Sequence, residues 1–139
     1  MFSSSGFSAA NAYRQVSAQT RVENASPHML IQMLFDGLFQ CLNAARGAMQ
    51  RQEIEEKGVQ IAKAVRILQE GLVLGLDMDK GGELAANLRL VYDFCVKQLT
   101  SANLHNDVAK VEEVIALLQP IAQSWKEIGP QAEAAVHGG

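Results

Sequence analysis

The sequence predicts an all-α protein, an antiparallel up-down four-helix bundle with a short N-terminal helical segment. Apolar residues recur at the helical period of about 3.6 residues over long stretches of the chain. Strand signals are nearly absent, and prolines occur only at positions 27, 120 and 130. The breaks between the periodic stretches are short, so helices adjacent in sequence should pack antiparallel.

Length and composition predict one globular domain. The chain has 139 residues, of which 48% are hydrophobic and 19% are charged. The formal net charge is −3 and no predicted helix carries a basic stripe, so we expect no nucleic-acid partner. The start of the chain lacks the basic and apolar regions of a secretory signal, and no apolar run approaches the roughly 20 residues of a membrane span. We therefore expect a cytoplasmic protein that does not insert into membranes.

The first long helix should begin with Ser26 as its N-cap and Pro27 at the first helical position. Its periodic pattern fades near residues 51–52. The predicted buried stripe consists of Leu30, Ile31, Leu34, Phe35, Leu38, Leu42, Ala45 and Met49.

The second helix is predicted for residues 53–76 and ends in the segment 77–82, whose paired glycines suit a tight turn. Its stripe is Ile54, Ile61, Val65, Leu68, Leu72 and Leu76. The third helix should start near Glu83, because a carboxylate is favourable at a helix N-terminus. Its stripe is Leu84, Leu88, Val91, Tyr92, Cys95, Leu99 and Ala102.

The fourth helix should follow residues 103–106, with Asn106 or Asp107 as its cap, and should stop at Gly129. Pro120 is expected to kink it. Its stripe is Val108, Val111, Val114, Ile115, Leu118, Ala122 and Trp125. The bundle is thus assigned to residues 26–129, between a disordered Ser-rich start (1–10), an N-terminal strap (11–25) and a loose tail (130–139).

Motifs that would indicate catalysis or a cofactor are missing from the sequence. It contains no nucleophile elbow, no phosphate-binding loop and no Glu-x-x-His pair of the di-iron bundles. His28, His105 and His137 are expected to be ordinary surface or capping residues. We therefore predict no enzymatic activity, no cofactor and no metal site.

Some apolar residues lie away from the predicted stripes. Ile67 and Leu74 fall nearly opposite the stripe of the second helix, and Leu90 and Phe94 lie outside that of the third, with Asn87 in line with them. On the first helix, Met33 and Gly37 belong to a ridge of mostly small residues beside the core face. Such residues can simply flank a wide core. On three helices together, they favour apolar grooves for a segment of another protein.

Several of these stretches also resemble one protein family. They are Ala12-Tyr13 with Val16, then Asn24 to Gly37, then Leu76-Asp77 through Gly81-Gly82-Glu83 to Asn87-Leu88, and finally Ala102-Asn103, Asp107, Val114 and Trp125. Their order and spacing resemble the FliS family of flagellin export chaperones. The family commonly has Tyr and Thr where this chain has Phe35 and Asn24.

The resemblance implies a helical bundle in the bacterial cytosol that binds the disordered C-terminal segment of flagellin. Binding would prevent premature filament assembly and keep flagellin fit for type III export. The resemblance also implies links to other flagellar regulators, including an anti-sigma factor, and to components of the export apparatus. Tyr13 matches the family's N-terminal tyrosine, and Asn87 matches an asparagine of its third helix. The predicted partner-binding residues are Tyr13, Met33, Gly37, Ile67, Leu74, Asn87, Leu90 and Phe94.

Two other functions remain open from the sequence. A histidine phosphotransfer domain is also a helical bundle, but it needs an exposed histidine in mid-helix. A structural bundle that associates with itself through the same grooves is the other alternative. We expect the chain to be a monomer or a weak homodimer.

Overall fold

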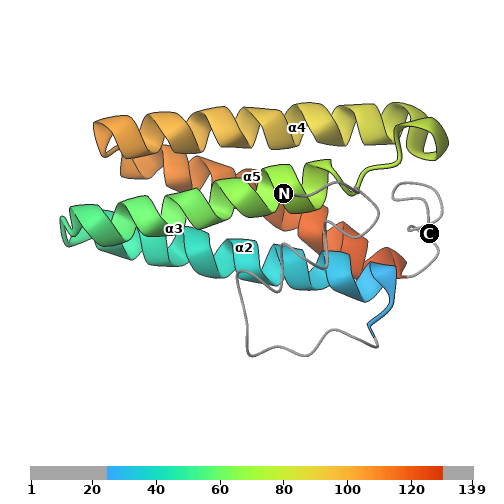
Figure 1. The fold of residues 1–139 in the computed structure, drawn as a ribbon, viewed down its shortest axis with the longest axis horizontal. Helices are drawn as coiled ribbons and strands as arrows, with labels where there is room; N and C mark the ends of the chain where they lie inside the picture. Colours follow the sequence, from blue (N-terminus) through green and yellow to red (C-terminus); the bar gives the residue numbers. More distant parts are fainter. Residues whose placement is uncertain (1–24, 130–139) are drawn as a thin grey trace.

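The computed structural model describes residues 25–129, and all regular secondary structure in this range is helical. The elements are α2 (Pro27–Gln50), α3 (Ile54–Arg66), the π-helix η2 (Ile67–Val73), α4 (Met78–His105) and α5 (Val108–Ile128). η2 continues α3 without a break, so the bundle has four rods, and successive rods run in opposite directions (Figure 1). The predicted all-α class is confirmed. The start 1–10, nearly all of the strap 11–25 and the tail 130–139 lie outside the described residues.

The start of α2 follows from its sequence as predicted. The Ser26 hydroxyl accepts a hydrogen bond from the Met29 main-chain N–H at 3.1 Å, and Pro27 occupies the first turn, where its missing N–H costs nothing. α2 then packs against α3 and α5, whereas α4 runs along the other side of the bundle (Figure 1). α5 continues as a helix through Pro120.

The buried stripe of the second rod differs in part from the prediction, since Ile61, Leu68 and Leu72 are buried as predicted but other positions are not. Lys57, Ile61 and Ala64 face inwards on α3, whereas Ile54 is 61% exposed. The true stripe is therefore rotated around the helix towards Ile67, which is fully buried. η2 adds to this effect, because i→i+5 bonding turns the chain less per residue than an α-helix does. Placing Ile67 opposite the core was wrong.

The turn between the second and third rods also differs in detail. Asp77 caps α4 by accepting hydrogen bonds from the main-chain N–H groups of Asp79 and Lys80 at 3.1 and 2.9 Å. The segment 78–81 therefore forms a short helical turn, and the long straight part of α4 begins after Gly82, near Glu83 as predicted. The helix then kinks at Gly82, whose φ of 52° and ψ of −128° are accessible mainly to glycine. Leu84, placed in the core stripe from the sequence, is 52% exposed just beyond this kink.

One continuous apolar core joins all the rods. It contains most of the predicted stripes of α2, α4 and α5, and both cysteines are buried in it as free thiols. Burial raises the pKa of the Cys95 thiol to about 12 and also raises that of Cys41. Both side chains thus serve as small hydrophobic residues, as their positions in the helical pattern predict.

Candidate partner-binding surface

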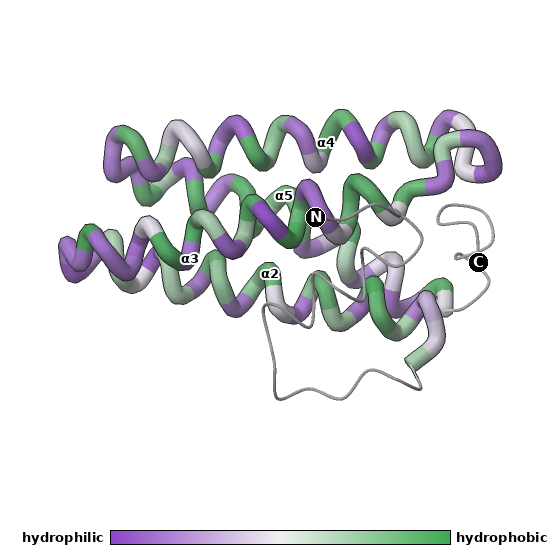
Figure 2. Tube along the Cα trace, viewed as in Figure 1, coloured by the Kyte–Doolittle hydropathy of each residue, from purple (hydrophilic) through white to green (hydrophobic). Residues whose placement is uncertain are grey.

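The outer face of α4 carries exposed apolar side chains. Leu90 is 69% exposed and Phe94 is 42% exposed, although both are large hydrophobic residues. Asn87 is exposed one turn before Leu90, and Glu83 and Lys97 are exposed farther along the same face. At about 100° per residue, the spacing of these five positions aligns them in a single row. In Figure 2, hydrophobic and hydrophilic residues alternate along α4.

α5 extends this row into a wider surface. The Gln98 side-chain amide donates to a Glu113 carboxylate oxygen at 2.6 Å, which fixes the register between the antiparallel helices α4 and α5. Counted from the Gln98–Glu113 pair, Leu117 of α5 lies level with Phe94 of α4, and Ile121 lies level with Leu90. Both α5 residues are half-buried against the core.

At the far end of this surface, Leu84 and Ile128 lie nearly level and are both 52% exposed. We call the whole surface the α4–α5 strip. It consists of Leu84, Asn87, Leu90, Phe94, Leu117, Ile121 and Ile128. Large apolar residues that lie together at the surface are typical of sites that bind another protein.

The remaining predicted partner-binding residues lie in other places. Leu74 is 41% exposed at the end of η2, away from the core as expected. Met33 is half-buried and packs against the core, and Gly37 is buried within α2. Ile67 is buried, so a partner cannot reach it without a rearrangement of the bundle. Tyr13 lies outside the described residues.

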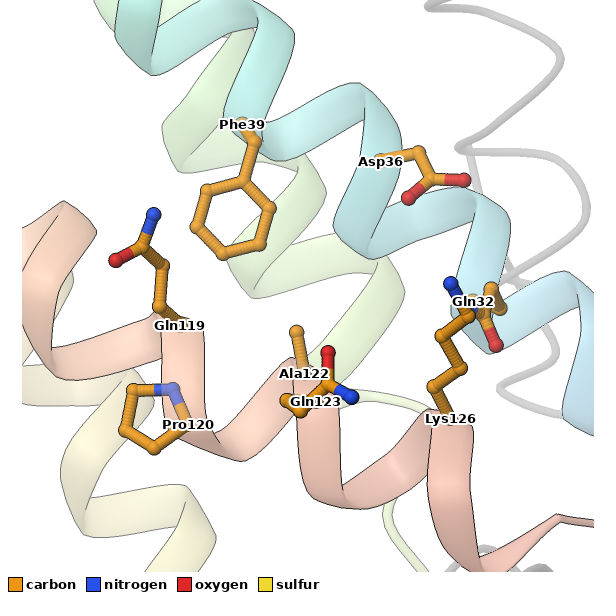
Figure 3. Close-up of a pocket in the computed structure, with 8 residues that line it drawn as sticks. All are labelled: Gln32, Asp36, Phe39, Gln119, Pro120, Ala122, Gln123 and Lys126. Atoms are coloured by element: carbon orange, nitrogen blue, oxygen red, sulfur yellow. The ribbon is translucent and has the colours of Figure 1, made fainter.

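A second concave surface lies between α2 and α5 (Figure 3). It has a volume of about 470 Å³ and is open to solvent. The ring of Phe39 points from α2 towards α5, and Lys126 extends from α5 towards α2. The lining residues are Gln32, Asp36, Phe39, Gln119, Pro120, Ala122, Gln123 and Lys126. Three glutamine side chains supply both donors and acceptors, which suits the main chain of an extended polypeptide.

Asp36 is the acidic residue of this groove. Partial burial raises the pKa of its carboxyl group, and the nearby Lys126 ammonium partly offsets this rise. The groove thus contains one acidic and one basic group in a mainly amide lining.

The sequence did not predict a clamp that joins the first turn of α2 to the last turns of α5. His28 is only 8% exposed, and its Nε2 donates to the main-chain carbonyl of Trp125 at 2.9 Å. The Trp125 indole N–H donates in return to the His28 carbonyl at 3.1 Å, and the two rings stack with centroids 4.8 Å apart. His28 was expected to be a surface or capping residue: the surface position is wrong because the side chain is buried, whereas its bond to a carbonyl in the last turn of α5 is a capping contact. Because a carbonyl can only accept, Nε2 must carry a proton.

The sequence also did not predict a buried lysine at the opposite end of the bundle. Lys57 is 5% exposed, and its ammonium donates to the Asn103 main-chain carbonyl at 3.0 Å and to Asn106 Oδ1 at 3.2 Å. Both acceptors belong to the end of α4, where the last carbonyls have no partner within the helix. Lys57 therefore caps a neighbouring helix.

The described range shows neither a cluster of metal-ligating side chains nor a membrane-spanning helix. Within residues 25–129, no three side chains of the His, Cys, Asp and Glu types gather where they could hold a metal ion. The helices of this same range are also too short or too polar to cross a membrane. The features described above are two surfaces that can bind another chain, the α4–α5 strip and the groove between α2 and α5, and two clamps that hold the bundle.

Comparison with known proteins agrees with a binding role. The family model of the flagellar protein FliS matches residues 9–132. The chain belongs to the FliS family. It is 46% identical to the flagellar secretion chaperone FliS of Salmonella typhimurium, over 95% of this chain and 96% of the relative. It is 45% identical to the flagellar secretion chaperone FliSB of Pseudomonas aeruginosa, over 84% and 91% of the two chains.

A third relative is the flagellar secretion chaperone FliS of Escherichia coli, at 43% identity over 84% of this chain and 85% of the relative. FliS proteins are chaperones and not enzymes, so the prediction of a non-enzymatic role in flagellar export is confirmed. A role as a flagellar secretion chaperone implies that this FliS-family chain binds flagellar export substrates.

Proposed function

We propose that this chaperone binds the disordered C-terminal segment of flagellin in the bacterial cytosol, prevents its premature assembly and delivers it for type III export. The single observation that supports a client surface most strongly is the exposure of Leu90, Phe94, Leu84 and Ile128 along two adjacent helices. A chain that folds on binding must recover its lost conformational entropy by burying roughly 1,000–3,000 Å². Only a long apolar surface can supply such burial.

The α4–α5 strip and the groove between α2 and α5 suit different parts of one client. The α4–α5 strip offers apolar area, and the groove between α2 and α5 offers amide groups. α5 borders both surfaces, so one client segment can pass from the strip over α5 into the groove. Leu74 and Met33 are further candidates for client contact, and the strap with Tyr13 is a candidate cover for the strip in the free protein.

The test is a calorimetric titration of the full chain with a synthetic peptide of the flagellin C-terminal segment, with mass determination by light scattering. We expect a 1:1 complex. Leu90→Asp with Phe94→Asp should weaken binding at least tenfold while helicity by far-UV circular dichroism is unchanged. Met29→Asp, at a 47% exposed apolar position on α2, is the matched control and should bind as the wild type does.

Failure of the wild-type chain to bind the peptide would refute the proposal. A protein that is already a stable oligomer, and that dissociates when Leu90 and Phe94 are replaced, would instead support the self-associating bundle. The phosphotransfer alternative is not favoured by the described histidines. His28 is buried in its clamp, and His105 lies at the last residue of α4.

A further inference from the structure

The α4–α5 strip contains a polar residue where an apolar one would be expected. Asn87 lies between Leu84 and Leu90 on α4, and the α4–α5 register places it level with Ser124. The Asn87 side chain is exposed and bonds to no other residue of the range 25–129. Its amide has two donor hydrogens and an acceptor oxygen, which no side chain or main-chain group of this range satisfies.

The strip is suited to a helical client segment. An extended segment would need hydrogen bonds for its own main chain, but α4 and α5 already use theirs, and the strip is otherwise mainly apolar. A helix satisfies its main chain internally. The row from Glu83 to Lys97 spans about 21 Å, or four helical turns.

The charges at the two ends of the row also complement a helix. The Glu83 carboxylate favours the positive N-terminal end of a helix dipole, and the Lys97 ammonium favours the negative C-terminal end.

Such a client helix must satisfy Asn87. When the strip is covered, the amide loses its water, and an unpaired buried amide is strongly unfavourable. The main chain of a helix has no free groups in mid-helix, so the partner has to be a client side chain. The geometry points to Asn87 as the residue that sets the register of the bound client, by requiring a polar client side chain at its own level. A single buried asparagine fixes register in coiled coils by the same physics. This inference rests on the proposed function.

The test is a double-mutant cycle that combines Asn87→Leu with alanine substitutions at each polar position of the flagellin peptide. We expect one peptide position to lose about tenfold in affinity for the wild-type chaperone and to lose less than twofold for Asn87→Leu. All other polar positions should show less than twofold coupling. Thr100→Leu is the matched control, because Thr100 is exposed on α4 outside the row, and it should give no coupling.

The outcomes separate this inference from the function. If the wild-type chain binds the peptide but no position couples to Asn87, the register role is refuted and the chaperone function stands. Equal coupling at several adjacent positions would also refute it, because the client would then lie in several registers. If the wild-type chain does not bind the peptide, or if its strip is covered by a second copy in solution, both proposals fail.

Discussion

Replacement of Lys57 by methionine should destabilise the bundle by about 2–3 kcal/mol. The substitution keeps the length of the aliphatic chain and the helix propensity, but it removes an ammonium that donates two hydrogen bonds to the end of α4. A hydrogen bond to a charged group contributes about 1.5–3 kcal/mol. The two hydrogen bonds together exceed the predicted loss, because burying the ammonium has a desolvation cost that the substitution removes. The Asn103 carbonyl also loses its partner.

Urea unfolding followed by far-UV circular dichroism measures this change directly. For a chain of this size, about 2–3 kcal/mol corresponds to a fall in Tm of roughly 8–12 °C. Lys97→Met is the matched control, because Lys97 is exposed, and it should alter stability by less than about 0.5 kcal/mol.

A second substitution isolates the contact itself. Asn106 adopts a left-handed conformation with φ of 51°, which glycine adopts without strain, so Asn106→Gly removes Oδ1 and keeps the turn. Each single variant should be destabilised, and the double variant should be destabilised by less than the two changes combined. If Lys57→Met is as stable as the Lys97→Met control, the capping contact makes no net contribution to stability, and the prediction is refuted.

Three further predictions concern the rest of the bundle. Trp125→Phe should cost about 1–2 kcal/mol in urea unfolding, because it removes the indole hydrogen bond to His28 and reduces the buried area, and an unchanged midpoint would contradict the clamp. Gly82→Ala should cost about 1–3 kcal/mol because the positive φ at this position is strained for alanine, whereas Gly58→Ala should be neutral or stabilising. Neither new methyl group would meet another atom, so the two variants differ only in backbone conformation. Equal effects of the two substitutions would contradict strain at the kink. The Cys95 thiol should resist alkylation in the folded state at pH 8, because it is buried and protonated. Its pKa rises on folding from 9.0 to about 12, so burial of the protonated thiol stabilises the fold below pH 9, and this stabilisation is lost between about pH 9 and 12. Urea midpoints measured at increasing pH test this loss.

Local signals explain which parts of the fold the sequence predicted well. The start of α2 is defined by Ser26 and Pro27, because serine is favoured as the N-cap and proline is favoured in the first helical turn. The stripes of α2 and α5 were correct because their apolar residues all face one neighbouring core. The end of α5 at Gly129 was correct for the same local reason.

The second rod was predicted less well because its pattern contains a lysine. Counting Lys57 as polar and Ile54 as apolar rotated the predicted stripe by about half a helix face, and Ile67 was then assigned to the wrong side. Nothing local to α3 indicates that the end of α4 will supply two acceptors for an ammonium. The switch to π-helical bonding at Ile67 also depends on packing rather than on propensity.

The candidate surface was predicted in part. Leu74, Leu90 and Phe94 were expected to be exposed, and they are, because each lies well away from its helix's core-facing side chains. The contribution of α5 was missed. Leu117 and Ile121 border the apolar stripe of their own helix, and only the register fixed by Gln98 and Glu113 shows that they extend the row on α4.

The composition of the outer row on α4 also bears on whether this surface binds a second copy of the chain. Leucine at position 87 would join Leu84, Leu90 and Phe94 into an unbroken apolar face, which a second copy could cover in any register. The amide of Asn87 makes that association unfavourable unless a polar partner lies opposite, and Glu83 and Lys97 limit the face at both ends. Self-association of Asn87→Leu should therefore increase, with a larger sedimentation coefficient at high concentration than the wild type. If Asn87→Leu sediments as the wild type does at every concentration, the amide does not protect the strip from self-association, and this reasoning is refuted.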